Sequence, residues 1–288
     1  MYPIQFKPIP MYFGRKRLLI LLICQLVGPT LMAHAAFPLH SSPFFREPIA
    51  KRALSKEMQP RIAINPGNLS DSVLIDAVSN MVIRSFSDLP GGIRITHAVN
   101  VGSPAQVHYT YDLDKGMIVQ VWHGRFLNAS TMWIGRGDGS SRPLGDAKYL
   151  GKPVPAIEKL NTPQAAWAQD TAGTGFKPKG YVLNAAGQPT FRYVIYGSAV
   201  DDASTVMENG KGIHREIVLK NQVEGLYMHL AMGSHIEMLS DGSYAIDDKS
   251  YNIRIDDGGG NKPVIREVSG KQELIIPIQK KLTYSIIF

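Results

Sequence analysis

Short runs in which apolar and polar residues alternate are the feature that most constrains the fold of this chain. In one run, Phe191, Tyr193 and Ile195 fall on one side of an extended chain, and the residues between them fall on the other. A period of two is typical of a β-strand with one face in the core. Similar runs occupy Gln106–Tyr111, Thr190–Gly197, Ile213–Lys220, Leu226–Met232 and Tyr251–Asp256.

Turn sequences separate these runs. Gly, Asn and Asp cluster between them, as they do in hairpin turns, and three further strand-like runs close the chain at Val264–Val268, Glu273–Ile278 and Leu282–Phe288. The best helix candidate, Pro163–Ala168, is short. The pattern predicts an all-β fold, a large antiparallel β-sandwich of about a dozen strands with long irregular loops. The weakly periodic middle, 126–181, is expected to form a functional loop or a flap over the sheet.

The N-terminus has the pattern of an export signal. Arg15, Lys16 and Arg17 precede an apolar run, Leu18–Val27, and small residues follow at Ala33 and Ala35. That run is too short for a comfortable membrane span, so a cleaved signal peptide over residues 1–35 is predicted, and an uncleaved membrane anchor is the alternative.

This division predicts the rest of the domain organisation. A Pro-rich arm or linker follows over residues 36–70, and a single β-sandwich domain fills residues 71–288. The mature protein is then periplasmic or secreted, with no stable membrane span after cleavage.

Cleavage would remove the only cysteine and much of the basic charge. Cys24 lies inside the apolar run, so the mature chain would have no thiolate ligand, no disulfide and no cysteine nucleophile. Residues 1–35 also hold four Lys and Arg and no acid, so their loss lowers the net charge from +7 to +3. A charge this small does not indicate nucleic-acid binding, and no cofactor or metal motif is present.

The densest group of aromatic and charged residues lies between positions 121 and 139. Flat aromatic faces beside hydrogen-bonding side chains suit a sugar ring, so a carbohydrate ligand is predicted here. The predicted ligand-binding residues are Trp122, Arg125, Trp133 and Arg136, with Asp138, Tyr193 and Arg215 as second choices. The alternative is structural: both indoles fill the core, and both arginines brace loops.

Catalytic motifs are weaker. No Gly-x-Ser-x-Gly nucleophile elbow, phosphate loop or paired metal-binding histidines occur in the sequence. An enzyme would instead use a histidine such as His123 or His229 as a base, with Asp or Glu as the acid. The catalytic residues stay open at this point.

Several ordered blocks resemble a family. The blocks of this chain that carry the resemblance are Val107–Leu113, Val121–Phe126, Trp133–Gly137, Pro143–Gly145, Gly180–Leu183, Gly187–Tyr193 and Glu273–Ile278. They resemble an uncharacterised bacterial extracytoplasmic β domain that often accompanies c-type cytochrome modules and quinoprotein-like sugar dehydrogenases. The resemblance covers residues 80–288 and implies an extracytoplasmic oxidoreductase or cytochrome as a partner. The chain departs from the fused members because it has no Cys-x-x-Cys-His, so it cannot hold covalent haem, and because Asn128 stands where relatives would have an acid.

These observations predict an extracytoplasmic accessory or binding module, carbohydrate-recognising and associated with sugar oxidation or electron transfer. One alternative is a sugar-active lyase, epimerase or hydrolase on the same scaffold. The other is a structural component of an exported assembly.

Overall fold

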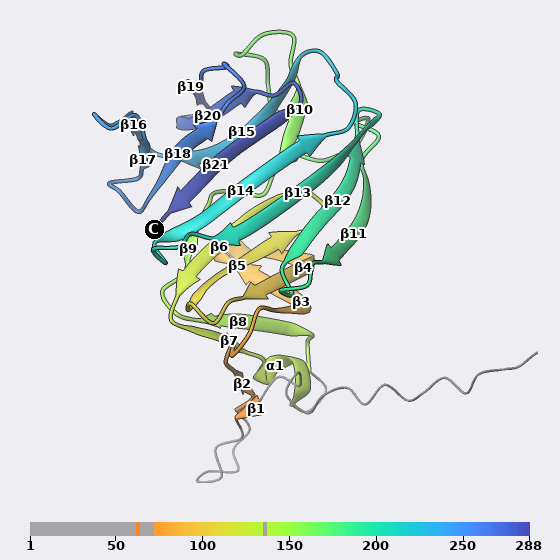
Figure 1. Ribbon diagram of the computed structural model, residues 1–288, viewed down its shortest axis with the longest axis vertical. Coiled ribbons are helices and arrows are strands. Elements are labelled where there is room, and N and C mark those ends of the chain that lie inside the picture. The colour runs from red at the N-terminus through yellow and green to blue at the C-terminus, as the bar shows by residue number, and fades with distance from the viewer. Residues whose placement is uncertain (1–61, 64–71, 135–136) are drawn as a thin grey trace, which may run out of the picture. The chain divides into compact units, whose positions relative to one another are not determined.

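Strands make up most of the computed structural model, which describes residues 62–63, 72–134 and 137–288. All of these residues belong to one compact unit of the chain, Leu54–Phe288. The predicted signal peptide, 1–35, lies outside the described residues, and so does the predicted arm, 36–70, apart from residues 62 and 63. The prediction of an all-β fold is confirmed (Figure 1).

Three sheets form the fold. The nine-stranded sheet has the order β1-β2-β7-β8-β3-β4-β5-β6-β9, the four-stranded sheet β10-β15-β20-β19, and the eight-stranded sheet β11-β12-β13-β14-β21-β18-β17-β16. All pairs are antiparallel except β3 with β8. The described residues hold twenty-one strands, more than the dozen that the sequence indicated, because several short strands lie in stretches without clear alternation.

The nine-stranded sheet takes its strands from the first half of the described chain. Its strands are β1 (Ile62–Ala63), β2 (Leu74–Ile75), β3 (Met81–Leu89), β4 (Ile93–Gly102), β5 (Val107–Asp112), β6 (Met117–His123), β7 (Arg125–Asn128), β8 (Ser140–Leu144) and β9 (Lys148–Tyr149). A 3₁₀ turn (Pro90–Gly92) joins β3 to β4, and a single helical turn, α1 (Ser130–Trp133), follows β7.

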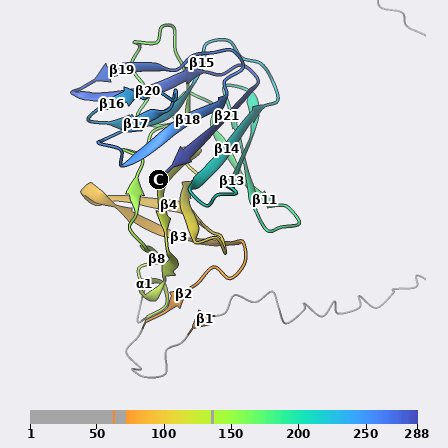
Figure 2. The ribbon, with the colours of Figure 1, turned by 60° about the vertical axis from the view of Figure 1, so that its left-hand side comes forward.

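The other two sheets come from the part of the chain that follows β9. The four-stranded sheet has β10 (Ile157–Lys159), β15 (Leu226–Gly233), β19 (Val264–Val268) and β20 (Lys271–Pro277). The eight-stranded sheet has β11 (Lys177–Leu183), β12 (Pro189–Ile195), β13 (Ser198–Val206), β14 (Gly212–Leu219), β16 (Ile236–Met238), β17 (Tyr244–Ile246), β18 (Tyr251–Asp257) and β21 (Lys281–Ile287). In both ribbon views the β19–β20 hairpin lies beside β16 and β17 (Figures 1 and 2).

The main core lies where the inner faces of the three sheets meet. One continuous cluster takes Val99 from β4, Ile217 from β14 and Leu274 from β20, each fully buried. Within it, the Tyr111 and Phe191 rings of the two large sheets stack with their centroids 3.7 Å apart. This face-to-face packing is that of a β-sandwich.

The nine-stranded sheet also buries its second face. The expected solvent side of the run 106–111 is therefore wrong: His108 and Thr110 are 1% and 0% exposed. The reason is that β8 returns to pair with β3, β7 pairs with β8, and the two strands cover this face.

Polar side chains fill part of the covered space, and each bonds to the next strand. Asn100 Nδ2 donates to Ser85 Oγ at 2.8 Å, Thr110 Oγ1 donates to Asn100 Oδ1 at 2.7 Å, and Gln120 Nε2 donates to Thr110 Oγ1 at 2.8 Å. Ser85 Oγ lies 2.7 Å from Ser141 Oγ of β8. We call Ser85, Asn100, Thr110, Gln120 and Ser141 the polar row.

The predicted helix at Pro163–Ala168 is wrong, since that segment consists of turns and irregular chain. Six residues are too few to offset the cost of starting a helix in the absence of packing on its apolar face. Instead the Trp167 side chain is anchored, because its Nε1 donates to the Pro155 carbonyl at 2.8 Å. The ring covers the outer face of the four-stranded sheet, beside His229 and Arg266. The flap expected over residues 126–181 is thus confined to the link between β10 and β11, because β7, β8, β9 and β10 occupy much of the rest.

Candidate functional site

The residues predicted to bind a ligand do not come together. Trp122 is fully buried in a second core cluster, where its ring lies nearly parallel to that of Phe126. Its Nε1 donates to the carbonyls of Arg125 and Phe126, both at 3.1 Å. Neither its face nor its N–H is open to a sugar, so the structural alternative holds for this indole.

Two of the second-choice residues also lie in the core. Tyr193 is 3% exposed and packs in the main cluster. Arg215 is 2% exposed and bonds to the Asp202 carboxylate, the Gly116 carbonyl and the Tyr284 hydroxyl. Neither side chain is open to a ligand in this structure, because the inner face of each strand is filled by the opposite sheet.

Three predicted residues are exposed. Arg125 forms an ion pair with Asp76, with its Nε 2.8 Å from Oδ1, and lines a hollow of about 380 Å³. Asp138 pairs with Arg94 at 3.0 Å, and the Trp133 side chain is 67% exposed. Arg136 lies outside the described residues.

The histidines named as candidate bases do not face an open cleft. His229 is 6% exposed under the Trp167 ring, with its Nε2 3.8 Å from Glu273 Oε1. His123 is exposed, and its Nε2 lies 3.0 Å from the Phe288 carbonyl oxygen. No group of three or more His, Cys, Asp or Glu side chains within the described ranges could hold a metal ion.

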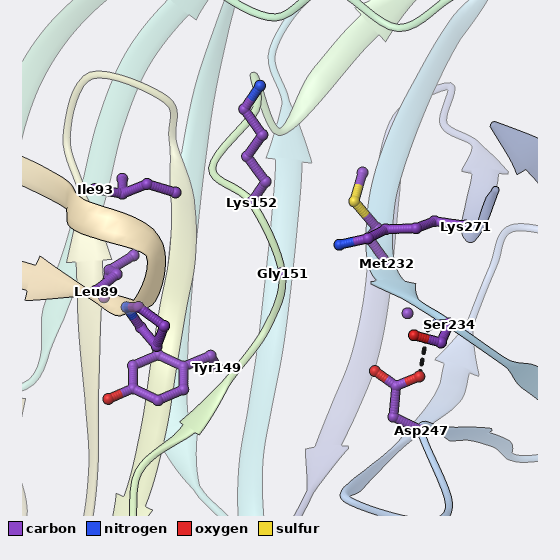
Figure 3. A pocket seen from close by; sticks show the side chains of 11 residues that line it. Leu89, Ile93, Tyr149, Gly151, Lys152, Met232, Ser234, Asp247 and Lys271 are labelled. Carbon is purple, nitrogen blue, oxygen red and sulfur yellow. Dashed lines mark hydrogen bonds between the residues drawn. The ribbon is translucent and has the colours of Figure 1, made fainter. Parts of the chain in front are cut away.

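A pocket that the sequence did not indicate lies between the nine-stranded sheet and strands β15, β17 and β20. Its cavity volume is about 260 Å³. Figure 3 shows Tyr149 and Lys152 on one side, and Lys271, Ser234 and Asp247 on the other. We call these five residues the lysine pocket.

Backbone geometry shapes one wall of the lysine pocket. Asp247, Asp248 and Lys249 follow β17, and all three have positive φ angles, of 46°, 53° and 66°. This turn places Asp247 Oδ1 2.6 Å from the Ser234 backbone N–H and 3.1 Å from that of His235. The second carboxylate oxygen has no hydrogen bond to the described part of the chain, so it can accept one from a ligand.

Glycines keep the lysine pocket open. A Cβ on Gly233 would lie 2.8 Å from Asp247 Oδ1 and 2.9 Å from Ile246 Cγ2, closer than non-bonded atoms pack. Gly151 has a φ of 104°, and a Cβ there would lie 3.1 Å from Met232 Cβ. Larger residues at either position would close the space between the two walls.

The charge of the lysine pocket is positive. A two-residue turn, Ser269–Gly270, with φ angles of 51° and 76°, presents Lys271 at the start of β20, and its side chain extends toward the opposite wall (Figure 3). Gln169 Oε1 holds Lys152 Nζ at 2.9 Å. In the part of the chain that the structure describes, neither ammonium forms an ion pair, so both can attract an anion.

An aromatic ring borders these charges. The Tyr149 side chain, 43% exposed, comes from the short edge strand β9. An exposed ring can stack on the C–H face of a sugar, and the lysines, Ser234 and Asp247 supply donors and acceptors for its polar groups. The lysine pocket can therefore bind a small polar ligand that carries negative charge.

The fold defines the class of this protein as an all-β sandwich with a curled nine-stranded sheet. Neither helical segment in the described ranges has the length and apolarity needed to cross a membrane. A scan against models of known protein families finds no match to this chain. A search of curated proteins likewise finds none that is similar.

Proposed function

We propose that this protein is an extracytoplasmic binding module that holds an acidic carbohydrate, such as a hexuronate, in the lysine pocket. One observation carries the proposal. The Lys271 ammonium forms no ion pair with a carboxylate of the described residues, and it lies opposite the exposed Tyr149 ring. A lysine in this position would bind a sugar carboxylate.

Size and chemistry favour one sugar unit. A cavity of about 260 Å³ lies just below the usual range of small-molecule pockets, about 300–1,000 Å³. Among the described residues that line it, Asp247 is the one carboxylate. Because glycoside hydrolysis ordinarily needs two carboxylates, this pocket supports binding without cleavage of a glycosidic bond.

The resemblance to the cytochrome-associated β domain gives this role a context. An accessory module that holds an acidic sugar would serve an extracytoplasmic oxidoreductase or cytochrome partner. Export and the partner both stay predictions from the sequence, and the binding experiment does not depend on them.

Titration calorimetry with galacturonate and with galactose tests the proposal, since the two sugars differ in the carboxylate. We expect galacturonate to bind at least about tenfold more tightly, because a charge-assisted bond contributes about 1.5–3 kcal/mol. Lys271→Gln should remove this preference, Tyr149→Ala should weaken both sugars, and Lys262→Gln, an exposed lysine outside the pocket, should change neither. Equal affinity for the two sugars, or a Lys271→Gln protein that keeps the preference, would contradict the proposal.

A further inference from the structure

A second group of chemistry-bearing residues lies on the outer face of the eight-stranded sheet. His214 of β14 pairs with Ser285 of β21, and Ser285 pairs with Arg254 of β18. Asp256 follows Arg254 by two residues at a shift in the strand register, and its bonds to His214, Ser285 and Arg254 place it on the same face. The core lies on the other face of these strands, where Ile213, Tyr284 and Ile253 are buried.

Asp256 is the centre of the group. Its Oδ2 accepts a hydrogen bond from Ser285 Oγ at 2.6 Å and lies 2.9 Å from His214 Nδ1, and its Oδ1 accepts from Arg254 Nε at 2.8 Å. Partial burial opposes ionisation, but the bonds from Ser285 and Arg254 outweigh it, and the pKa of Asp256 is lowered. The ionised carboxylate fixes the imidazole with its proton on Nδ1.

This tautomer leaves the Nε2 lone pair of His214 free. Within the described residues Nε2 has no hydrogen-bond partner, and His214 lines an open hollow of about 500 Å³ together with Glu208, Asn209 and Arg254. A histidine that is oriented by a carboxylate and open to a hollow through its other nitrogen is arranged as a general base. Ser285 is fully buried and donates to Asp256, so it is not a nucleophile, and water must fill that role.

We propose that His214 is the general base of a second, hydrolytic site, which cleaves small neutral acyl esters. His214 Nε2 takes a proton from a water molecule as the water oxygen bonds to the acyl carbon. The carbonyl π electrons move to the carbonyl oxygen, which can accept hydrogen bonds from Arg254 and from the Asn209 side-chain amide. When the carbonyl re-forms, the bond to the alcohol oxygen breaks, and this oxygen takes the proton back from His214. One ester and one water give one acid and one alcohol.

Charge and chemistry select this substrate class. The described residues that line the hollow include one cation, Arg254, and one exposed anion, Glu208, so the hollow favours a neutral ligand over a charged one. A single base with water suits esters, because an alcohol leaves more easily than an amine. This site shares no lining residue with the lysine pocket. A negative result at one site therefore does not contradict the proposal for the other.

Hydrolysis of 4-nitrophenyl acetate, followed by absorbance, tests the inference. His214→Gln should lower kcat/KM by at least about 100-fold, the low end of the range for loss of a general base. The chain offers a matched control, because His97 Nδ1 lies 2.8 Å from Asp114 Oδ2 in a second exposed His–Asp pair. His97→Gln should keep the wild-type rate. Equal losses in the two variants, or no loss in His214→Gln, would overturn the inference.

Asp256→Asn separates a positioning role from a merely structural one. The charged groups that face the His214 ring are Asp256 and Arg254 of β18 and Glu208 of the β13–β14 turn. Asp256→Asn should lower kcat by at least about fivefold, with KM and the circular dichroism spectrum unchanged, whereas an unchanged kcat would sink the inference.

Discussion

Asp202 holds the Arg215 guanidinium in the core between the two large sheets, with Arg215 Nε 2.9 Å from Asp202 Oδ1. Both side chains are almost fully buried. Asp202→Asn would leave a buried cation without its carboxylate, which costs about 3–5 kcal/mol of unfolding free energy. Urea unfolding measures this loss.

An exposed neighbour supplies the control for this pair. Arg192 of β12 lies 3.2 Å from Asp201 of β13 on the outer face of the sheet, and Arg192→Met should cost less than about 1 kcal/mol because water screens the pair. A loss in Asp202→Asn as small as that in Arg192→Met would show that Arg215 finds another partner or reaches water.

Gly233→Ala should damage the lysine pocket. The added Cβ would lie 2.8 Å from Asp247 Oδ1, so the carboxylate must leave the backbone N–H groups of Ser234 and His235. We expect a cost of about 1–3 kcal/mol in unfolding free energy and a weaker affinity for galacturonate by calorimetry. Gly210→Ala, where the φ is 66° and the added atom meets open space, should strain the backbone without changing the affinity. Unchanged binding in Gly233→Ala would mean that Asp247 does not shape the site.

Asp112 should make the protein less stable as the pH rises. Burial, the largest cause, raises its pKa from 3.8 to about 6. Between these values the unfolded chain loses its proton first, so the native state binds more protons, and the free energy of unfolding falls with rising pH. The contribution is complete below the unfolded pKa and lost above about pH 6, a change of roughly 3 kcal/mol.

The test compares wild type with Asp112→Asn in urea at pH 4 and pH 7. The amide oxygen can still accept the hydrogen bond from the Asp114 N–H, so the variant should be relatively more stable at pH 7 than at pH 4. Other carboxylates contribute equally to both proteins and cancel. Parallel pH dependences would show that Asp112 is not desolvated in the native state.

The two tryptophans of the predicted site should respond differently to truncation. Trp122→Ala removes a fully buried ring and should cost about 3–5 kcal/mol while leaving the affinity for galacturonate unchanged. Trp133→Ala removes a mostly exposed ring and should stay within about 0.5 kcal/mol of wild type. A loss of sugar affinity in either variant, with the fold retained, would restore the first predicted site.

The alternation of apolar and polar residues correctly predicted the strands whose inner faces depend only on neighbouring residues. The runs at Thr190–Gly197 and Tyr251–Asp256 became β12 and β18 with the expected inner faces, because side-chain alternation follows directly from the extended backbone. The same signal already placed Arg215 on the apolar side with Ile213 and Ile217. A stricter use of alternation would therefore have assigned Arg215 to the core and not to a binding site.

Long-range pairing decided the rest. Nothing in the run 106–111 indicates that β7 and β8 will cover its second face. The lysine pocket takes Tyr149, Ser234, Asp247 and Lys271 from four separate elements. Of the segments that form the lysine pocket, only the Ser269–Gly270 turn can be recognised from the sequence. A turn sequence does not show which part of the fold the turn will face.

The polar row affects the register in which strands β3 to β6 and β8 pair. Each hydroxyl or amide of the row finds its partner only when neighbouring strands meet at one offset. A slip of two residues would keep the apolar face inward and preserve the backbone ladder, yet it would set hydrocarbon against unbonded polar groups in a dry interior. The polar row thus distinguishes the native strand alignment from other offsets that the hydrophobic pattern alone would allow.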